Sequence, residues 1–466
     1  MVTTDTLFLS VRELGERIKS KQLSPVELAE GYLERARTVG ARLNAYATLT
    51  PDLALQQARA AEAEIKSGKY RGPLHGIPYA AKDLLAVKGY PTQWGARPYA
   101  NQKFDQDATV IKKLEEAGAV LLGKAAMIEL AGGMGYRFAS ASISGAAKNP
   151  WNEDCWTCGS SSGSGAIVSS GLAAFAIGTE TWGSIVCPSS FTGISGLRPT
   201  YGRVSRHGAM ALAYSMDKIG PMARAAEDCG LILSAIAGHD PADRASLPSD
   251  QAAFSFPQIR SQMWKPLRIG WLEQKMLVQG GDQVMKDAVA VVKRSGTMTD
   301  AKLPEGPWEA AAGIVVSVEG AAAFDSLIES GKVADLTDPS GKIGGYVNKE
   351  IPSGDFLRTQ RIRGVLKDKM REMFANFDIL ATATLPVTAS KLEENLDEGL
   401  NFPDPIGGIG NFLGLPAISV PCGFAGNKMP LGIQFVAAPL NEHLGLRAAT
   451  AFQSQTDWHK RRPPLA

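Results

Sequence analysis

Apolar and polar positions along this chain switch repeatedly between helical and extended spacing. Two Ser-x-x-Glu segments, beginning at Ser10 and Ser24, match the pattern that starts a helix, and Pro25 occupies the first helical position of the second. After Pro25, apolar side chains recur on one helical face. Further helices are predicted over residues 54–66, 109–117, 124–130, 225–237, 282–293 and 356–377.

Short apolar runs bounded by turn residues predict buried strands. These runs cover residues 78–81, 119–122, 267–272, 379–384, 416–421 and 432–437. Helix and strand signals alternate along the chain, which favours an α/β fold with a mixed or parallel sheet. Neither an internal repeat nor a clean linker divides the 466 residues, so we expect a single domain over residues 1–466.

Three segments are predicted to be loops because they are polar or rich in glycine. They are residues 241–257, 338–346 and 404–414. The last one contains Gly407, Gly408 and Gly410, a composition that favours a mobile lid over a pocket.

Residues 158–200 contain the densest chemical signal, two clusters of Gly and Ser separated by a small apolar run. Ser160, Ser161, Ser162 and Ser164 lie in the first cluster, and Ser184 lies in the second. Residues 166–177 between them predict a buried helix that can continue into a strand. Hydroxyls among glycines provide a nucleophile, a proton carrier and accessible backbone N–H groups, as acyl transfer requires. A flexible linker is the alternative, although such an apolar run does not suit a solvated linker.

Lys82 is the candidate base, because it directly follows the apolar run 78–81. Its side chain either reaches solvent or is partly buried. Burial would lower the pKa of the amine and make it a general base near neutral pH. Asp83, the next residue, fits a turn cap.

Other catalytic arrangements find less support. A serine nucleophile often uses a histidine, but His239, His443 and His459 lie in turns or in the polar tail. Residues 159–163 formally match the G-x-S-x-G elbow, which requires a buried strand before it, and residues 154–158 are a poor strand.

Cofactor and metal signals are also weak. Cys155 and Cys158 form one C-x-x-C without a second pair at zinc spacing, so we expect no metal. The Gly163-Ser-Gly165 pattern is a poor dinucleotide signal, so we expect no cofactor.

Composition narrows the class of protein. The chain is 44% hydrophobic and 21% charged, as in globular proteins. Its 49 basic and 47 acidic residues leave a net charge of +2, which argues against a nucleic-acid partner. Five cysteines suit a reducing compartment, and the N-terminus lacks a secretory signal. The longest apolar stretch is shorter than the roughly 20 residues that span a bilayer, so we expect a cytoplasmic protein without membrane contact.

Two motifs resemble the amidase signature family. That family shows GGSSGGS and then G-T-D-T-G-G-S-I-R-x-P-A, and this chain has CGSSSGSG at residues 158–165 and GTETWGSIVCPS at residues 178–189. Other matching pieces are residues 72–83, 118–124, 148–152, 415–421 and 456–463. The resemblance runs from about residue 10 to the end, with a signature core at about residues 70–240. It implies an amidase-signature fold, with α/β/α layers and a large mixed central sheet surrounded by helices.

The resemblance also implies a Ser–cis-Ser–Lys triad. Ser184 would be the nucleophile, Ser160 the middle serine and Lys82 the base. A proton would pass from Ser184 through Ser160 to Lys82, and then back to the leaving nitrogen. The implied oxyanion hole consists of backbone N–H groups of Thr181, Trp182, Gly183 and Ser184. The substrate pocket is expected near Gly132, Gly133, Met134 and Trp182, and Ser161 and Ser164 are expected to be supporting hydrogen-bonding groups.

Four positions depart from the family motif. Trp182 replaces a glycine, so it is either strained by a positive φ or free to wall the pocket with its indole. Glu180 replaces the usual Asp and Val186 the usual Arg, which removes or rewires any charge contact between them. Ser162 replaces a glycine in the first cluster.

These observations predict an amidohydrolase that cleaves the C–N bond of a small, hydrophobic or aromatic amide, an anilide or a carbamate through an acyl-enzyme on Ser184. Its expected partner is the small-molecule substrate, and the expected state is a monomer or homodimer. The alternative is the glutamine-hydrolysing subunit of a tRNA-dependent amidotransferase, which shares the fold. A binding protein without activity is the third hypothesis.

Overall fold

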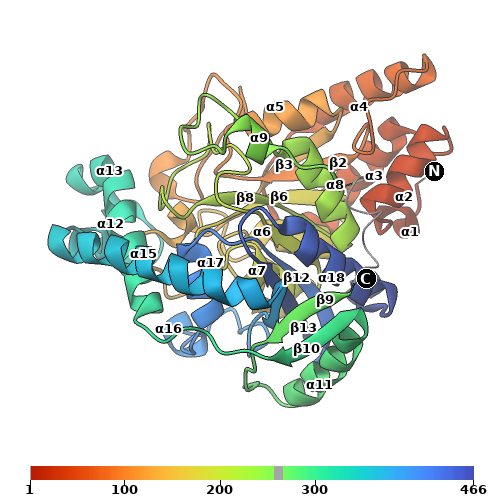
Figure 1. The fold of residues 1–466 in the computed structure, drawn as a ribbon. Helices are drawn as coiled ribbons and strands as arrows, with labels where there is room; N and C mark the ends of the chain where they lie inside the picture. The colour runs from red at the N-terminus through yellow and green to blue at the C-terminus, as the bar shows by residue number, and fades with distance from the viewer. Residues whose placement is uncertain (1, 257–265, 466) are drawn as a thin grey trace.

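The fold is known from a computed structural model that describes residues 2–256 and 266–465. Eleven strands of this described part form one mixed sheet, with helices on both of its faces (Figure 1). In order across the sheet they are β1 (Tyr46–Leu49), β3 (Val120–Ala125), β2 (Pro78–Lys82), β6 (Phe175–Glu180), β8 (Lys218–Ala223), β7 (Ser195–Arg198), β12 (Ala417–Phe424), β13 (Pro430–Ala437), β11 (Ile379–Ala383), β9 (Leu267–Trp271) and β10 (Gly296–Asp300). The expected α/β/α layers around a large mixed sheet are thereby confirmed.

Helices account for most of the remaining regular structure. They are α1 (Thr4–Leu7), α2 (Val11–Lys19), α3 (Pro25–Arg35), α4 (Pro51–Lys66), α5 (Thr109–Glu116), α6 (Ser162–Ser169), α7 (Val186–Thr192), α8 (Ala226–Ile236), α9 (Ser249–Ala252), α11 (Gly281–Val292), α12 (Trp308–Ala323), α13 (Asp325–Glu329), α14 (Pro339–Lys349), α15 (Ser353–Asn376), α16 (Leu396–Gly399), α17 (Pro405–Phe412) and α18 (Glu442–Ser454). Two strands, β4 (Lys148–Asn149) and β5 (Asn152–Trp156), form a separate small sheet.

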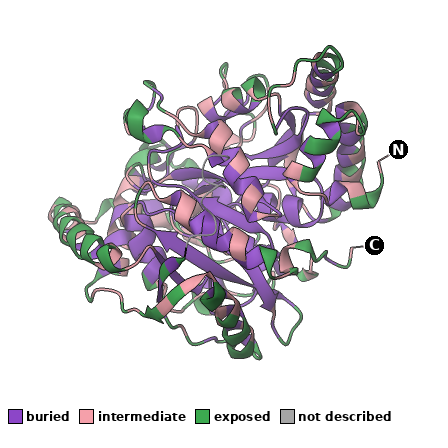
Figure 2. Ribbon diagram, turned by 45° about the vertical axis from the view of Figure 1, so that its right-hand side comes forward, coloured by how far each residue is buried: buried purple, intermediate pink, exposed green. Residues whose placement is uncertain are grey.

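The strands at the centre of the sheet are buried on both faces. Every residue of β2, β3, β6 and β8 is buried, because helices cover both sides (Figure 2). Such strands show continuous apolar runs instead of alternation, and the runs at residues 78–81 and 119–122 predicted β2 and β3. β6 was expected only as a continuation of the helix in residues 166–177, and β8 was not predicted. β2 is parallel to both neighbours, β3 and β6, whereas β6 is antiparallel to β8.

Helix caps behave as their sequences predict. Ser10 and Glu13 form a reciprocal capping box at the start of α2. Ser24 accepts hydrogen bonds from the backbone N–H groups of Val26 and Glu27 at the start of α3. Ion pairing between Arg462 and Asp5, 2.5 Å apart, brings the C-terminal tail to α1, and both termini lie on one side of the molecule (Figure 1).

Two helix predictions need correction. Residues 124–130 are not a helix: β3 continues to Ala125, because buried Lys124 pairs with Asp83 on the neighbouring segment. A 3-10 turn follows at Glu129–Gly132. The apolar run 166–177 divides between α6, which begins inside the first Gly/Ser cluster, and β6.

Two predicted loops are helices. Residues 338–346 mostly belong to α14, where Asp338 caps the first turn and Pro339 occupies its first position. The predicted lid at residues 404–414 is α17, which is capped by Asp404 and buried from Ile406 to Phe412. The glycines in both segments suggested loops, although Asp338-Pro339 and Asp404-Pro405 are typical helix starts. Within residues 241–256, the predicted connection contains only the short α9, and residue 257 lies outside the described residues.

No helix within residues 2–256 and 266–465 has both the length and the apolar character that crossing a membrane requires.

Candidate active site

Lys82 is the last residue of β2, at the centre of the sheet, and its side chain is fully buried. Its Nζ lies 2.7 Å from Ser160 Oγ, 2.9 Å from Thr179 Oγ1 and 3.4 Å from the Thr179 carbonyl oxygen. Burial lowers the pKa of Lys82 to about 7, although Asp217 and Glu180 act in the opposite direction. Of the two alternatives for this side chain, burial is therefore correct, and the amine can take up or release a proton near neutral pH.

The first Gly/Ser cluster is fastened to β6 by side-chain hydrogen bonds. Ser161 Oγ donates to the Thr179 carbonyl at 3.1 Å and accepts from the Thr179 N–H at 3.3 Å. The Gly159–Ser160 peptide bond is cis. A Cβ on Gly159 would lie 2.8 Å from Ile128 and 2.9 Å from Trp156, so only glycine fits there.

Ser161 and Ser164 differ in their contacts within this cluster. Ser161 is a supporting hydrogen-bonding residue as expected, but buried Ser164 Oγ has no hydrogen-bond partner among the described residues. The segment before Gly159 does contain a strand, β5, but β5 pairs with β4 in the small sheet. The G-x-S-x-G match therefore lacks the central-sheet strand of a nucleophile elbow.

The second cluster forms a tight turn between β6 and α7. Ser184, in this turn, is buried and lies five residues after Thr179, which contacts Lys82. The left-handed conformation falls on Gly183, with φ +82°, and not on Trp182, so the strained alternative for Trp182 is wrong. In the described part of the chain, the backbone N–H groups of Trp182, Gly183 and Ser184 have no hydrogen-bond acceptor, and Ser184 Oγ makes no hydrogen bond to Ser160.

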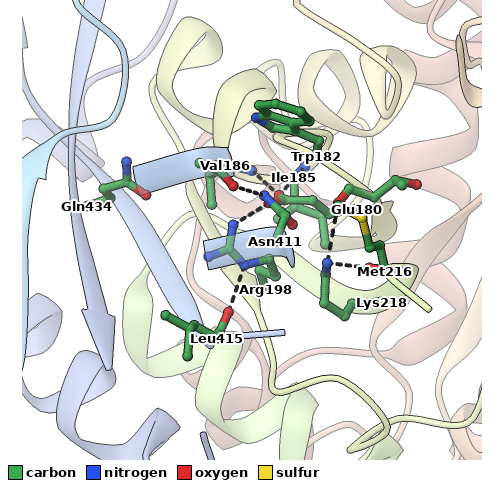
Figure 3. A network of polar contacts seen from close by, with 12 residues as sticks. Glu180, Trp182, Ile185, Val186, Arg198, Met216, Lys218, Asn411, Leu415 and Gln434 are labelled. Carbon is green, nitrogen blue, oxygen red and sulfur yellow. Dashed lines mark hydrogen bonds and ion pairs between the residues drawn. The ribbon is translucent and has the colours of Figure 1, made fainter. Parts of the chain in front are cut away.

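A buried charge network of Glu180, Arg198 and Lys218 stabilises this turn (Figure 3). Glu180 accepts hydrogen bonds from the N–H groups of Ile185 at 2.9 Å and Val186 at 3.0 Å, and from Arg198 Nη1 at 2.6 Å. Burial alone would raise the pKa of Glu180, but Arg198 and Lys218 outweigh it and hold the pKa at about 2. Val186 replaces the arginine of the family motif, and Arg198 pairs with Glu180 in its place.

Arg198 and Lys218 make further contacts that hold the network in place. Arg198 Nε donates to the Leu415 carbonyl at 2.9 Å, which connects the network to the segment after α17. Buried Lys218 donates to the carbonyls of Thr181, at 3.4 Å, and Met216. Its desolvation lowers the pKa of Lys218 well below the ordinary value. These contacts fix both ends of the turn that contains Ser184.

The indole of Trp182 turns away from the network toward α17. Its Nε1–H donates to Asp404 Oδ2 at 2.9 Å, and Asp404 Oδ1 accepts from the Gly407 N–H at 3.1 Å. Desolvation, the largest influence, raises the pKa of Asp404 to about 7, against the effect of both donors. The sequence placed Asp404 only in the loop expected over the pocket; its contact with Trp182 was missed, because no local pattern predicts a partner 222 residues away.

Two cavities flank this region. The smaller, of about 400 Å³, is lined by Thr179 and Thr181 beside the polar site and by Ala131, Leu84 and Leu212. The larger, of about 740 Å³, includes Asp404, Ile406, Trp308, Leu272 and Leu277 in its lining.

The segment predicted to form the substrate pocket lies close to the smaller cavity. Ala131, which lines that cavity, directly precedes Gly132. Gly133 and Met134 pack against Phe324 and Gly345 at α12 and α14.

Cysteines and possible metal ligands were the remaining chemical candidates. Cys155 and Cys158 are free thiols. Across residues 2–256 and 266–465, no three His, Cys, Asp or Glu side chains are grouped closely enough to hold a metal ion.

Comparison with known proteins agrees with this fold. The family model described as Amidase matches residues 27–446. A glutamyl-tRNA(Gln) amidotransferase subunit of Acinetobacter baumannii (strain AYE) is 36% identical, over 99% of each chain. The structure of native peptide amidase from Stenotrophomonas maltophilia is similar with a TM-score of 0.86 and 29% identity, over 98% of each chain.

A third relative shows the fold alone. It is a bacterial aryl acylamidase of the amidase signature enzymes, with a TM-score of 0.84 at 24% identity, over 97% of this chain and 98% of that one. The fold and the buried Lys82–Ser160 contact define an α/β hydrolytic enzyme with a lysine in its polar centre. The chain belongs to the Amidase family, the amidase signature enzymes, and is an enzyme that acts on amide C–N bonds.

Proposed function

We propose that this protein is a serine amidohydrolase with Ser184 as nucleophile, Ser160 as proton relay and Lys82 as base. The observation that carries the proposal is the 2.7 Å contact between the buried Lys82 amine and Ser160 Oγ, together with a Lys82 pKa of about 7. A neutral amine in that position can accept a proton through a hydroxyl. No imidazole of the described residues is hydrogen-bonded to either group, which favours lysine as the base.

The reaction then proceeds in balanced proton steps. Ser184 Oγ attacks the carbonyl carbon while its proton passes to Ser160, and the Ser160 proton passes to Lys82; the Ser184–Ser160 hydrogen bond, which this structure does not contain, forms in the substrate complex. The N–H groups of Trp182, Gly183 and Ser184 are free to stabilise the oxyanion, and one such donor contributes roughly 10²–10³ in rate. Lys82 returns the proton through Ser160 to the leaving nitrogen, and the C–N bond breaks. Water then attacks the acyl carbon and gives its proton through Ser160 to Lys82, the bond from that carbon to Ser184 Oγ breaks, and the proton returns to Ser184 as the acid leaves.

The smaller cavity supports an uncharged substrate. Leu84, Met210, Leu212 and Ile219 contribute apolar surface to its lining. An amide with a small, hydrophobic or aromatic group fits this chemistry, and an anilide or a carbamate presents the same carbonyl and nitrogen. The substrate is the only partner we propose, for a monomer or homodimer in the cytoplasm that needs no cofactor.

Glutamine hydrolysis within a tRNA-dependent amidotransferase is the second candidate, favoured by the 36% identity to a subunit of such an enzyme. A glutamine site needs charged groups for the substrate's ammonium and carboxylate. The buried charged groups of the smaller cavity already have partners within the protein: Arg206 pairs with Asp243, Asp217 accepts from Thr181, and Lys218 donates to two carbonyls. Arg244, which also lines the cavity, is exposed. Simple amide hydrolysis therefore agrees better with the cavity.

The test is covalent labelling by a small fluorophosphonate, followed by intact mass and peptide mapping. We expect the wild-type protein to be labelled at Ser184, and Ser184→Ala to lose the label. Ser164→Ala is the matched control, because Ser164 Oγ has no hydrogen-bond partner among the described residues, and it should label like the wild type. Labelling retained in Ser184→Ala would contradict the assignment.

A substrate panel separates the two candidate functions. The lone chain should release product from simple amides or anilides and leave glutamine intact. Release of ammonia from glutamine alone would instead favour the amidotransferase function.

A further inference from the structure

The larger cavity has no part in the proposed reaction, although it lies close to the turn that contains Ser184. Its volume of about 740 Å³ exceeds the 400 Å³ of the cavity beside Thr179 and Thr181. Asp404 belongs to the lining of the larger cavity and accepts a hydrogen bond from Trp182. Thr181, the residue before Trp182, lines the smaller one. Trp182 itself is in neither lining, but its chain neighbour Thr181 lines one cavity and its hydrogen-bond acceptor Asp404 lines the other.

Apolar packing also connects Trp182 with residues that line both cavities. Its partly buried side chain packs against a cluster of buried residues that serves both cavities. Leu212 of this cluster lines the smaller cavity, whereas Ile406 and Leu272 line the larger one.

The glycines of α17 lie directly against Trp182 and Asp404. A Cβ on Gly408 would lie 3.2 Å from Trp182 Cζ2, and a Cβ on Gly407 would lie 1.9 Å from Asp404 Oδ2. Side chains at these positions would displace the indole or its acceptor. The glycines at residues 407–410 predicted a mobile lid from the sequence. In the structure they instead allow α17 to approach Trp182 and Asp404 closely.

We propose that Trp182, held by Asp404, is the specificity-determining residue that separates the two cavities and restricts the substrate to groups that fit the smaller one. The inference rests on the proposed function, because it concerns the substrate of the same site. A smaller residue at position 182 joins the cavities and admits bulky amides.

Two fluorophosphonates that differ only in the group on phosphorus, methyl or biphenylmethyl, test this partition. In the wild type, we expect the methyl probe to label Ser184 at least tenfold faster than the biphenylmethyl probe. Trp182→Ala should reduce this ratio by tenfold or more. Trp182→Phe, which keeps an aromatic ring, should restore the ratio to within about threefold of the wild type.

Leu277→Ala is the matched control, because it removes apolar volume from the larger cavity at an exposed position away from Trp182. Its labelling ratio should equal that of the wild type. A wild-type ratio in Trp182→Ala, with methyl labelling intact, would overturn the inference. A wild-type protein that neither probe labels would contradict the proposed function instead.

A crystal structure of Trp182→Ala decides the partition without any chemistry at Ser184. One continuous cavity from Thr181 to Asp404 supports the inference, and two cavities that stay separate overturn it.

Discussion

At the scale of single residues, Lys82 and Lys124 are buried on neighbouring strands, but only Lys82 has partners that suit proton transfer. Lys124, on β3, lies 2.9 Å from the Asp83 carboxylate and 2.9 Å from Thr92 Oγ1. Burial lowers the pKa of Lys124, but the adjacent carboxylate favours its charged form. Among the described residues, the partners of Lys82, on β2, are the hydroxyls of Ser160 and Thr179 and one carbonyl. Without a carboxylate in contact, its ammonium form is less stabilised.

This difference leads to a pH prediction for Lys82. Because burial lowers its pKa from 10.5 to about 7, the amine is mostly protonated below pH 7 and mostly neutral above it. The rate of Ser184 labelling should therefore rise with pH through about 7 and level off above 8. The measurement is the second-order labelling rate between pH 5.5 and 9.

A Lys82→Arg variant completes the test, because a guanidinium stays protonated over this range. Loss of general base catalysis should reduce labelling by about 10²–10⁴-fold. A flat pH profile in the wild type, or near-normal labelling in Lys82→Arg, would contradict the role of Lys82. Ser164→Ala should keep the wild-type profile.

At the scale of elements, α17 can pack closely against the Ser184 region because its glycines have no side chains. Gly410 lies where a Cβ would be 2.6 Å from Arg198 Nη2, so this helix packs directly onto the guanidinium that holds Glu180. Glu180 in turn caps the first N–H groups of α7, after the turn that contains Ser184. One helix thereby fixes a turn more than 200 residues earlier in the chain.

Substitution of Gly410 tests this arrangement. Gly410→Ala should displace Arg198, destabilise the fold by about 1–3 kcal/mol and slow Ser184 labelling. Gly364→Ala on α15 is the matched control, since its Cβ would meet nothing within 4 Å and Ala favours a helix by roughly 0.5–1 kcal/mol. Thermal unfolding and labelling rates measure both effects. Equal melting temperatures for the two variants would refute the packing argument.

At the scale of the whole molecule, the sheet has two halves that meet at a short junction. Only three residue pairs join β7 to β12, from Ala417↔Arg198 to Ser419↔Gly196. A buried ion pair connects the same halves: Arg203 Nε and Nη2 each lie 2.9 Å from an oxygen of Glu442 on α18. Arg203 also donates to the carbonyls of Gln251, Ala253 and Leu440, so its charge is well satisfied.

Removal of one partner should weaken this junction. Glu442→Ala leaves Arg203 buried without its carboxylate and should destabilise the protein by about 3–5 kcal/mol. The double variant Arg203→Met/Glu442→Leu should recover part of that loss, because no charge remains buried. Asp368→Asn, which breaks the exposed pair with Arg371, should stay within about 0.5 kcal/mol of the wild type. Denaturant midpoints compare the variants, and an unchanged midpoint in Glu442→Ala would contradict this role of the pair.

Much of this protein is determined by its sequence alone. Strands such as β2, β3, β12 and β13 were predictable because buried strands form continuous apolar runs, although β7 and β8 were missed. The capped starts of α2 and α3 were predictable because their signals lie within four residues. The family and the layered α/β fold followed from the two Gly/Ser motifs and the alternation of elements. Such features depend on neighbours in the chain.

Only the tertiary structure decided which residues meet. Trp182 bonds Asp404 222 residues away, and Glu180 pairs with Arg198, whereas the motif had suggested position 186. The glycine-rich α17 became a helix because Asp404 caps it and surrounding side chains bury it, which outweighs the weak helix propensity of glycine. Likewise, the pKa of Lys82 is a property of its burial. Contacts between distant segments and loss of solvent arise only when the chain is folded, so no local pattern encodes them.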